Sequence, residues 1–123
     1  MNHTSFSIQI TEALINHYAH TSRDYNPIHL DKQAALSSGL PEKIAHGMLS
    51  VALSAKLMTP TLVKGLFVER FNIKILQPVY VNDTIEVTIQ ALDETNHSYK
   101  LTGFNQTTLK KILHARIKLN KLT

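Results

Sequence analysis

The chain has 123 residues, of which 43% are hydrophobic and 18% charged, a composition typical of a globular protein rather than a disordered or fibrous one. We therefore expect residues 1–123 to form one domain. Cysteine is absent, which excludes disulfides, thiolate metal sites and a cysteine nucleophile. No stretch approaches the ~18 apolar residues of a membrane span, and the first ten residues lack a signal-peptide pattern, so we expect a cytoplasmic protein with no membrane partner.

The net charge is +4, from 13 Lys and Arg residues against 9 Asp and Glu residues. This balance suits RNA, an anionic lipid, or a phosphate-bearing ligand such as a coenzyme. The basic residues are scattered, however, with Lys110 and Lys111 as the adjacent pair, and tryptophan is absent. Nucleic-acid sites usually show clustered basic residues or stacking aromatic residues. We therefore predict no nucleic-acid partner.

The N-terminal part of the chain alternates short elements with loops. Apolar and polar residues alternate over 5–10, which predicts a strand. Thr11 can cap a helix over 12–22. The pattern then predicts, in order, a proline-containing loop at 23–30, a short helix that Asp31 caps and Gly39 stops, and a loop ending at His46 and Gly47.

The segment 48–58 is almost entirely apolar, with eight apolar residues among eleven. We expect a helix of this kind to be buried nearly all round. The Thr59–Pro60 pair predicts its end.

After this segment the hydrophobic period changes to two. Apolar residues alternate with polar ones over 71–75, 85–91, 99–103 and 113–119, which predicts antiparallel strands with one buried face. Turns are expected at 82–83 and 93–96. One buried helix followed by four such strands, with the N-terminal strand as a fifth, predicts an α+β protein whose curved antiparallel sheet wraps around the helix, an arrangement called the hotdog fold. The fold alone does not fix the function.

The loop at 23–30 carries a dense set of polar side chains. Asp24, Asn26 and His29 surround Pro27, which stiffens the backbone between them. A carboxylate and an imidazole that share one water form a proton-transfer pair. The same residues are also typical of a structural turn, in which Asp24 caps the chain and His29 bonds to backbone atoms. The residue types alone leave both interpretations open.

The stretches RDYNPIHLD and IAHGML together resemble the hydratase-2 motif of the MaoC-like family of (R)-specific enoyl-CoA hydratases and dehydratases. The family pattern runs approximately D-x-N-P-(I/L/V)-H-x-(D/E), followed by H-G-M at the head of the hotdog helix. The matching positions are Asp24, Asn26, Pro27, Ile28, His29 and Asp31, then Ala45, His46, Gly47 and Met48. One departure is Arg23, where many members have glycine; it would point to solvent or contact ligand phosphates.

The resemblance implies the chemistry of the site. Asp24 and His29 would hold and activate the water that adds to an enoyl thioester, with Asn26 fixing their hydrogen bonding. The Gly47 amide would face the thioester carbonyl, where negative charge develops and where an N–H at a helix start is a pre-aimed donor. The implied reaction is reversible (R)-specific hydration of trans-2-enoyl-CoA to (R)-3-hydroxyacyl-CoA. It needs no redox cofactor and no metal, and the implied assembly is a homodimer whose sheets join edge to edge.

Other residues are candidates for substrate contacts. Ser50 and Ser54 lie on the helix near the loop, and His46 either contacts substrate or braces the loop before the helix. Lysines that flank the site are candidates for the phosphates of coenzyme A or an acyl carrier protein, namely Lys32, Lys43, Lys56 and Lys64.

Four alternatives stay open. A 3-hydroxyacyl-ACP dehydratase would use the same residues. A hotdog acyl-CoA thioesterase would place an acid on or near the helix, and 48–58 contains none. A non-catalytic acyl-CoA-binding module has no need of a proton-transfer pair. A metal face would form if the first helix continued far enough to present His17, His20 and Asp24 together.

Overall fold

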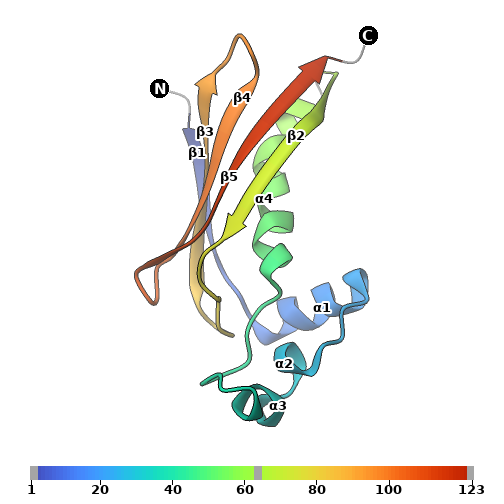
Figure 1. Cartoon of the computed structure of the whole chain (residues 1–123), viewed down its shortest axis with the longest axis vertical. Helices are drawn as coiled ribbons and strands as arrows, with labels where there is room; N and C mark the ends of the chain where they lie inside the picture. Colours follow the sequence, from blue (N-terminus) through green and yellow to red (C-terminus); the bar gives the residue numbers. More distant parts are fainter. Residues whose placement is uncertain (1–2, 63–64, 122–123) are drawn as a thin grey trace.

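The computed structural model describes residues 3–62 and 65–121, with four helices and five strands in these ranges. Figure 1 shows them, with bounds β1 His3–Gln9, α1 Glu12–Ser22, α2 Pro27–Leu30, α3 Lys32–Ser37, α4 Gly47–Leu62, β2 Leu66–Ile75, β3 Thr84–Asp93, β4 Ser98–Asn105 and β5 Lys110–Lys121. None of the helices in the described ranges is long and apolar enough to cross a lipid bilayer.

The five strands form one antiparallel sheet in the order β1-β3-β4-β5-β2. The long helix α4 lies against one face of this sheet, and the short helices α1, α2 and α3 gather at one end of it (Figure 1). This arrangement confirms the predicted α+β hotdog fold. The predicted N-terminal strand is also confirmed, since β1 pairs with β3 at one edge of the sheet.

The core fills the space between α4 and the sheet. Alternate residues of β3 and β5 are buried, as the period of two predicts. The core includes Ile85, Val87, Leu101, Leu113, Ala115, Ile117 and Leu119 from the sheet, with Leu49 and Met58 from α4. This core holds the start of α4 in a fixed position at the end of the sheet that carries the short helices.

A side-chain cap and a left-handed residue define the two ends of the first helix, α1. The Thr11 hydroxyl accepts a hydrogen bond from the Leu14 amide at 3.1 Å, which confirms the predicted cap. At the other end Arg23 adopts a left-handed backbone with φ of 61°. Glycine is favoured in that conformation because other residues pay about 1–2 kcal/mol there. This conformation explains why the motif often has glycine where this chain has Arg23, whose side chain is exposed.

The predicted loop at 23–30 contains a helical turn, α2, so that prediction was wrong in its second half. Asn26 caps the turn, because its side-chain oxygen accepts a hydrogen bond from the Ile28 amide at 3.2 Å. Pro27 occupies the first helical position, where its fixed φ is favourable and its missing N–H costs nothing. The proline that signalled a loop therefore starts a helix.

Two expectations for the long helix were also wrong. The helix α4 runs through Thr59–Pro60 to Leu62, because a proline within the last turn removes only one backbone hydrogen bond. It is not buried all round: the Met48 side chain is 50% exposed, and Ala52 and Ala55 are exposed as well. The sheet covers one side of α4, and no described element of this chain covers the other.

The edge strand β2 departs from the prediction of one buried face. Its residues Phe71, Ile73 and Ile75 stand opposite Ile117, Ala115 and Leu113 of β5, so they face the core side of the sheet. Yet Phe71 is 38% exposed and Ile75 is 46% exposed. The apolar period is present, but α4 covers this strand only in part.

Candidate active site

The backbone between α1 and α2 ties Asp24 to His29. The Asn26 amide donates to the Asp24 side-chain oxygen Oδ1 at 3.2 Å, and the Asn26 carbonyl accepts from the His29 amide at 3.1 Å. Asn26 thus links the two predicted catalytic residues through its backbone, while its side chain caps α2. The carboxylate of Asp24 is exposed and His29 is buried.

The ring of His29 has a defined tautomer. Its Nδ1 lies 2.7 Å from the carbonyl oxygen of Ile44, and because a carbonyl can only accept, Nδ1 carries the proton. The other nitrogen, Nε2, therefore holds a lone pair. Burial lowers the pKa of His29 below its usual 6.5, and the neighbouring His46 lowers it further, while the Ile44 carbonyl and Asp24 act in the opposite direction. At neutral pH His29 is a neutral proton acceptor.

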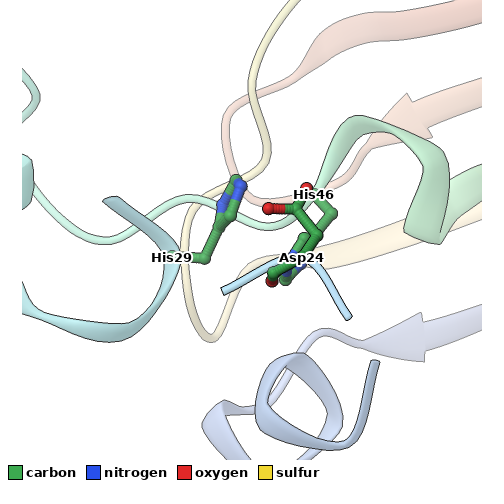
Figure 2. A group of neighbouring side chains, drawn as sticks. All are labelled: Asp24, His29 and His46. Carbon is green, nitrogen blue, oxygen red and sulfur yellow. The ribbon is translucent and has the colours of Figure 1, made fainter. Parts of the chain in front are cut away.

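His46 joins this pair from the loop before α4, as Figure 2 shows. Its side chain is 3% exposed, and its Nε2 lies 2.9 Å from the backbone carbonyl of Asp24, so Nε2–H donates there. Its ring stacks on that of His29 with centroids 3.8 Å apart and planes at 27°. Tyr18 contacts the ring at its edge, with centroids 5.0 Å apart. The sequence left two roles for His46, contact with substrate or bracing of the loop before the helix, and it predicted none of these contacts.

A cavity of about 320 Å³ opens beside the start of α4. Its lining comprises residues 44–47, Ser50, residues 75–79, Ile112 and Leu113. Gly47 is the first residue of α4, and a Cβ atom there would lie 2.8 Å from Cδ1 of Ile75. The first amides of a helix have no acceptor within the helix, so the Gly47 amide is available to a ligand. Among the described residues, His46 lines the cavity whereas Asp24 and His29 do not.

The two candidate serines line different cavities. Both are buried, but Ser50 lines the cavity beside Gly47, whereas Ser54 lines a second cavity of about 230 Å³. The Ser54 hydroxyl donates to the Ser50 carbonyl at 2.6 Å, which occupies its proton. The second cavity is otherwise apolar and lies between the exposed side of α4 and strand β2, with Phe71 and Val68 in its lining.

The donor atoms of Asp24, His29 and His46 lie within 4.8 Å of one another, a spacing that metal sites also show. One nitrogen of each ring is bonded to a backbone carbonyl, that of Ile44 or that of Asp24, so each imidazole has one nitrogen left for a cation. The predicted alternative metal face was wrong, because α1 ends at Ser22 and the His20 Nδ1 is bonded to the Tyr25 hydroxyl at 3.1 Å.

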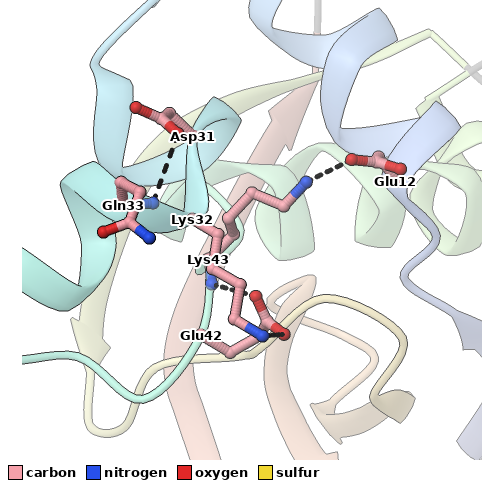
Figure 3. Close-up of polar contacts among 6 residues, drawn as sticks. All are labelled: Glu12, Asp31, Lys32, Gln33, Glu42 and Lys43. Atoms are coloured by element: carbon pink, nitrogen blue, oxygen red, sulfur yellow. Dashed lines mark hydrogen bonds and ion pairs between the residues drawn. The ribbon is translucent and has the colours of Figure 1, made fainter.

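Most of the lysines proposed for phosphate contacts are engaged (Figure 3). Lys43 pairs with Glu12, and Lys32 pairs with Glu42 at 3.6 Å. The Lys56 amino group lies 5.4 Å from the centre of the Phe6 ring, and Lys64 lies outside the described residues. The Lys32 side chain is 60% exposed, and exposed ion pairs contribute little, so Lys32 can exchange to an anion, whereas the Lys43 side chain is only 13% exposed in its pair with Glu12.

Two parts of the site carried no sequence signal. The Ile44 carbonyl that fixes the tautomer of His29 is a backbone atom, and so is the Asp24 carbonyl that binds His46. The segment after β2 lines the cavity because the Ala45 amide donates to the Val79 carbonyl at 2.7 Å. Such contacts depend on how two loops meet in space.

Comparison with known proteins supports the resemblance seen in the motif. Residues 2–112 match the model of the MaoC like domain family. The chain belongs to the MaoC-like family. It is 35% identical over 88 residues to an (R)-specific enoyl-CoA hydratase of Aeromonas caviae, a match that covers 69% of this chain and 66% of the relative.

Other relatives extend the range of reactions and show the fold. A mitochondrial 3-hydroxyacyl-acyl-carrier-protein dehydratase of Arabidopsis thaliana is 31% identical over 87 residues, which cover 69% of this chain and 52% of the relative. An R-hydratase structure from Pseudomonas aeruginosa superposes with a TM-score of 0.80 at 26% identity, covering 96% of this chain and 78% of that one. The match thus spans between half and two thirds of these two curated relatives.

Proposed function

We propose that this MaoC-like chain is a hydro-lyase that adds water to a trans-2-enoyl thioester to give the (R)-3-hydroxyacyl thioester, and that it catalyses the reverse dehydration. The observation that carries the proposal is the neutral His29, whose proton is fixed on Nδ1 by the Ile44 carbonyl and whose Nε2 is left to accept a proton. A nitrogen of this ring lies within 4.8 Å of an Asp24 carboxylate oxygen. The relatives named for hydration and dehydration of such thioesters support the reaction class.

The proposed reaction divides the work between the loop and the helix. Asp24 and His29 hold a water, and Nε2 of His29 takes one of its protons as the oxygen bonds to C3 of the enoyl group. The electron pair of the double bond moves toward the thioester carbonyl, whose developing charge meets the Gly47 amide at the start of α4. The proton held by His29 then returns to C2, so neither residue is consumed.

The thioesterase alternative lacks a group that its chemistry needs on this scaffold. The helix α4 contains no aspartate or glutamate over its sixteen residues. A binding module remains the simplest non-enzymatic alternative, but it gives no reason for a buried imidazole with a free lone pair next to a carboxylate. The choice between coenzyme A and an acyl carrier protein is left to experiment, since relatives of both kinds are similar to this chain.

We also propose that two copies associate through β2. This edge strand presents Phe71 and Ile75 on the core side with more than a third of each side chain exposed, and the exposed Ala52 and Ala55 of α4 line a cavity together with Phe71. An uncovered apolar edge strand invites pairing with a second strand. A second copy joined edge to edge would extend the sheet and cover this surface.

The function is tested by the loss of enoyl absorbance when the protein is added to crotonyl-CoA. Coupling the product to (R)- or (S)-specific 3-hydroxyacyl dehydrogenases then fixes the stereochemistry, and we expect the (R) product. A series of enoyl thioesters of increasing length on coenzyme A and on acyl carrier protein defines the substrate. Release of free thiol without hydration would instead identify a thioesterase, and an (S) product would contradict the proposed geometry.

A further inference from the structure

His46 has contacts that the proposed chemistry does not use. The ring is buried, and its Nδ1 is a buried nitrogen without a hydrogen-bond partner in the described part of the chain. Buried polar atoms are nearly always paired, so an unpaired one needs an explanation. The other contacts of the same residue supply it.

His46 contacts or adjoins each of the three groups assigned to the reaction. Its Nε2–H holds the Asp24 carbonyl at 2.9 Å, and its ring stacks on His29 at 3.8 Å. Its own carbonyl accepts from the Leu49 amide at 3.0 Å, which starts α4 with Gly47 as the first residue. The donor to Asp24 requires the proton on Nε2, and this requirement leaves Nδ1 as a lone pair with nothing to bond.

We propose that His46 is a positioning residue that aligns Asp24, His29 and the Gly47 amide with one another. This inference rests on the proposed function for its meaning, and on the contacts above for its geometry. Asp24, in the loop after α1, and His46, just before α4, are 22 residues apart in the chain. The side chain of His46 joins them directly by a hydrogen bond. Tyr18 packs against the ring and limits its rotation.

The proximity of His46 also affects the pKa of His29, the proposed base. Burial is the main cause that lowers the pKa of His29; of the groups that face it, the Ile44 carbonyl and the Asp24 carboxylate raise this pKa, and the electrostatic interaction with His46 lowers it. Replacing His46 by a residue that cannot carry charge removes that interaction and therefore raises the pKa of His29. Because a protonated His29 cannot accept a proton, the acidic limb of the kcat/KM profile moves to higher pH.

Two substitutions separate the two contacts. His46→Phe keeps a ring against His29 but loses the donor to Asp24, whereas His46→Gln keeps a donor at a similar reach but loses the ring. A net hydrogen bond corresponds to about a five- to tenfold change in rate, so we expect kcat to fall about that much in His46→Phe, which loses the donor, and by less in His46→Gln, which keeps one. We expect KM to change less than about threefold, because the other residues that line the cavity, Gly47 and Ser50 among them, are kept. In both variants the acidic limb moves to higher pH.

The matched controls are His114→Phe and His114→Gln, on the exposed outer face of β5. They introduce the same residues away from the site and should leave kcat, KM and the pH profile unchanged. If the His46 variants fold, keep wild-type kcat and leave the limb unmoved, the proposal is wrong. A rise in KM alone would also overturn it, since that result identifies a binding residue.

Nitrogen NMR of the unsubstituted protein tests the geometry without any variant or substrate. We expect the Nε2–H tautomer for His46 and the Nδ1–H tautomer for His29. A proton on Nδ1 of His46 would remove the bond to Asp24 and overturn the inference even if the protein hydrates enoyl thioesters. If no thioester turns over, the proposed function fails, and the His46 tautomer together with the His29 titration in the two variants still decides this inference.

Discussion

Two regions of the molecule depart from the usual distribution of polar and apolar residues, in opposite directions. At the end of the sheet that carries the short helices, the polar side chains of His29 and His46 are buried. Along β2, the apolar side chains of Phe71 and Ile75 are exposed. The first region satisfies most of its polar atoms within the chain, whereas α4 covers the second only in part.

The two regions point to two different functions, catalysis around His29 and self-association along β2. Burying a polar group is costly unless it is paired, so we interpret the buried polar cluster around His29 as serving proton transfer at the lone pair of His29 rather than stability. Burying a large apolar side chain is worth about 1.5–3 kcal/mol, so the exposed face of β2 represents stabilisation that a second copy could supply. Variants in one region should therefore change turnover, and variants in the other should change assembly.

The largest expected effect is on turnover. Asp24→Asn removes the basic oxygen and keeps the shape, and His29→Gln removes the proton acceptor. Acid–base groups typically contribute about 10²–10⁴-fold, so each variant should lose at least about 10²-fold in kcat. The double variant should be little worse than the poorer single one, because both groups act on one water. Steady-state hydration of crotonyl-CoA measures all three.

The matched control for these variants is Asp31→Asn in the same segment. The Asp31 side chain caps α3 by accepting from the Gln33 amide at 3.2 Å (Figure 3), and asparagine can do the same. Turnover should stay near the wild-type rate. If Asp24→Asn and His29→Gln both fold and hydrate substrate like the control, this loop is not the catalytic centre.

The next effect concerns assembly and leaves the site intact. Phe71→Glu places a charge on the uncovered core side of β2, whereas Asn72→Glu places it on the outer face beside Arg116. We expect Phe71→Glu to weaken self-association at least about tenfold, as loss of an interface anchor does, and Asn72→Glu to leave it unchanged. Sedimentation over a micromolar concentration range measures both. A wild-type protein that sediments as a monomer there would remove the basis for the edge-to-edge dimer.

A smaller effect is expected in the pH dependence of stability. Burial and His46 hold the pKa of His29 in the folded protein below 6.5, its value in the unfolded chain. Between these two pKa values the unfolded chain binds more protons, so stability falls as pH falls from about 6.5 toward the folded pKa. The loss is complete below the folded pKa. Urea unfolding at pH 7.5 and at pH 5 should show a smaller difference in His29→Gln than in the unsubstituted protein or in exposed His17→Gln; equal differences would contradict the sign.

Local patterns predicted more of the fold than of its contacts. The cap at Thr11 and the alternation in β3 and β5 are properties of neighbouring residues, and both were confirmed. The same alternation in β2 marks which face is apolar, but it cannot say whether anything covers that face. Pro27 indicates a loop as readily as a helix start, because the sequence does not show that Asn26 caps a helix directly before it.

For the site, the motif predicts the candidate side chains, and the structure shows what holds them. Asp24 and His29 stand five residues apart, so a loop can bring them together by local geometry. The bonds from His29 to the Ile44 carbonyl and from His46 to the Asp24 carbonyl join segments 15 and 22 residues apart through backbone atoms. Every residue has a backbone carbonyl, so no residue type signals such a contact.

The smallest expected effect is that of a chelator on turnover, where we predict none. His29 needs no metal to accept a proton at neutral pH, because its pKa is held below 6.5. One nitrogen of each stacked ring is bonded to a backbone carbonyl, and the lone pair of His29 is assigned to the water proton. The rate of crotonyl-CoA hydration should therefore be the same before and after EDTA. A rate that collapses with EDTA and returns with zinc would show that Asp24, His29 and His46 bind a metal ion, and it would move the buried polar region from proton transfer to metal chemistry.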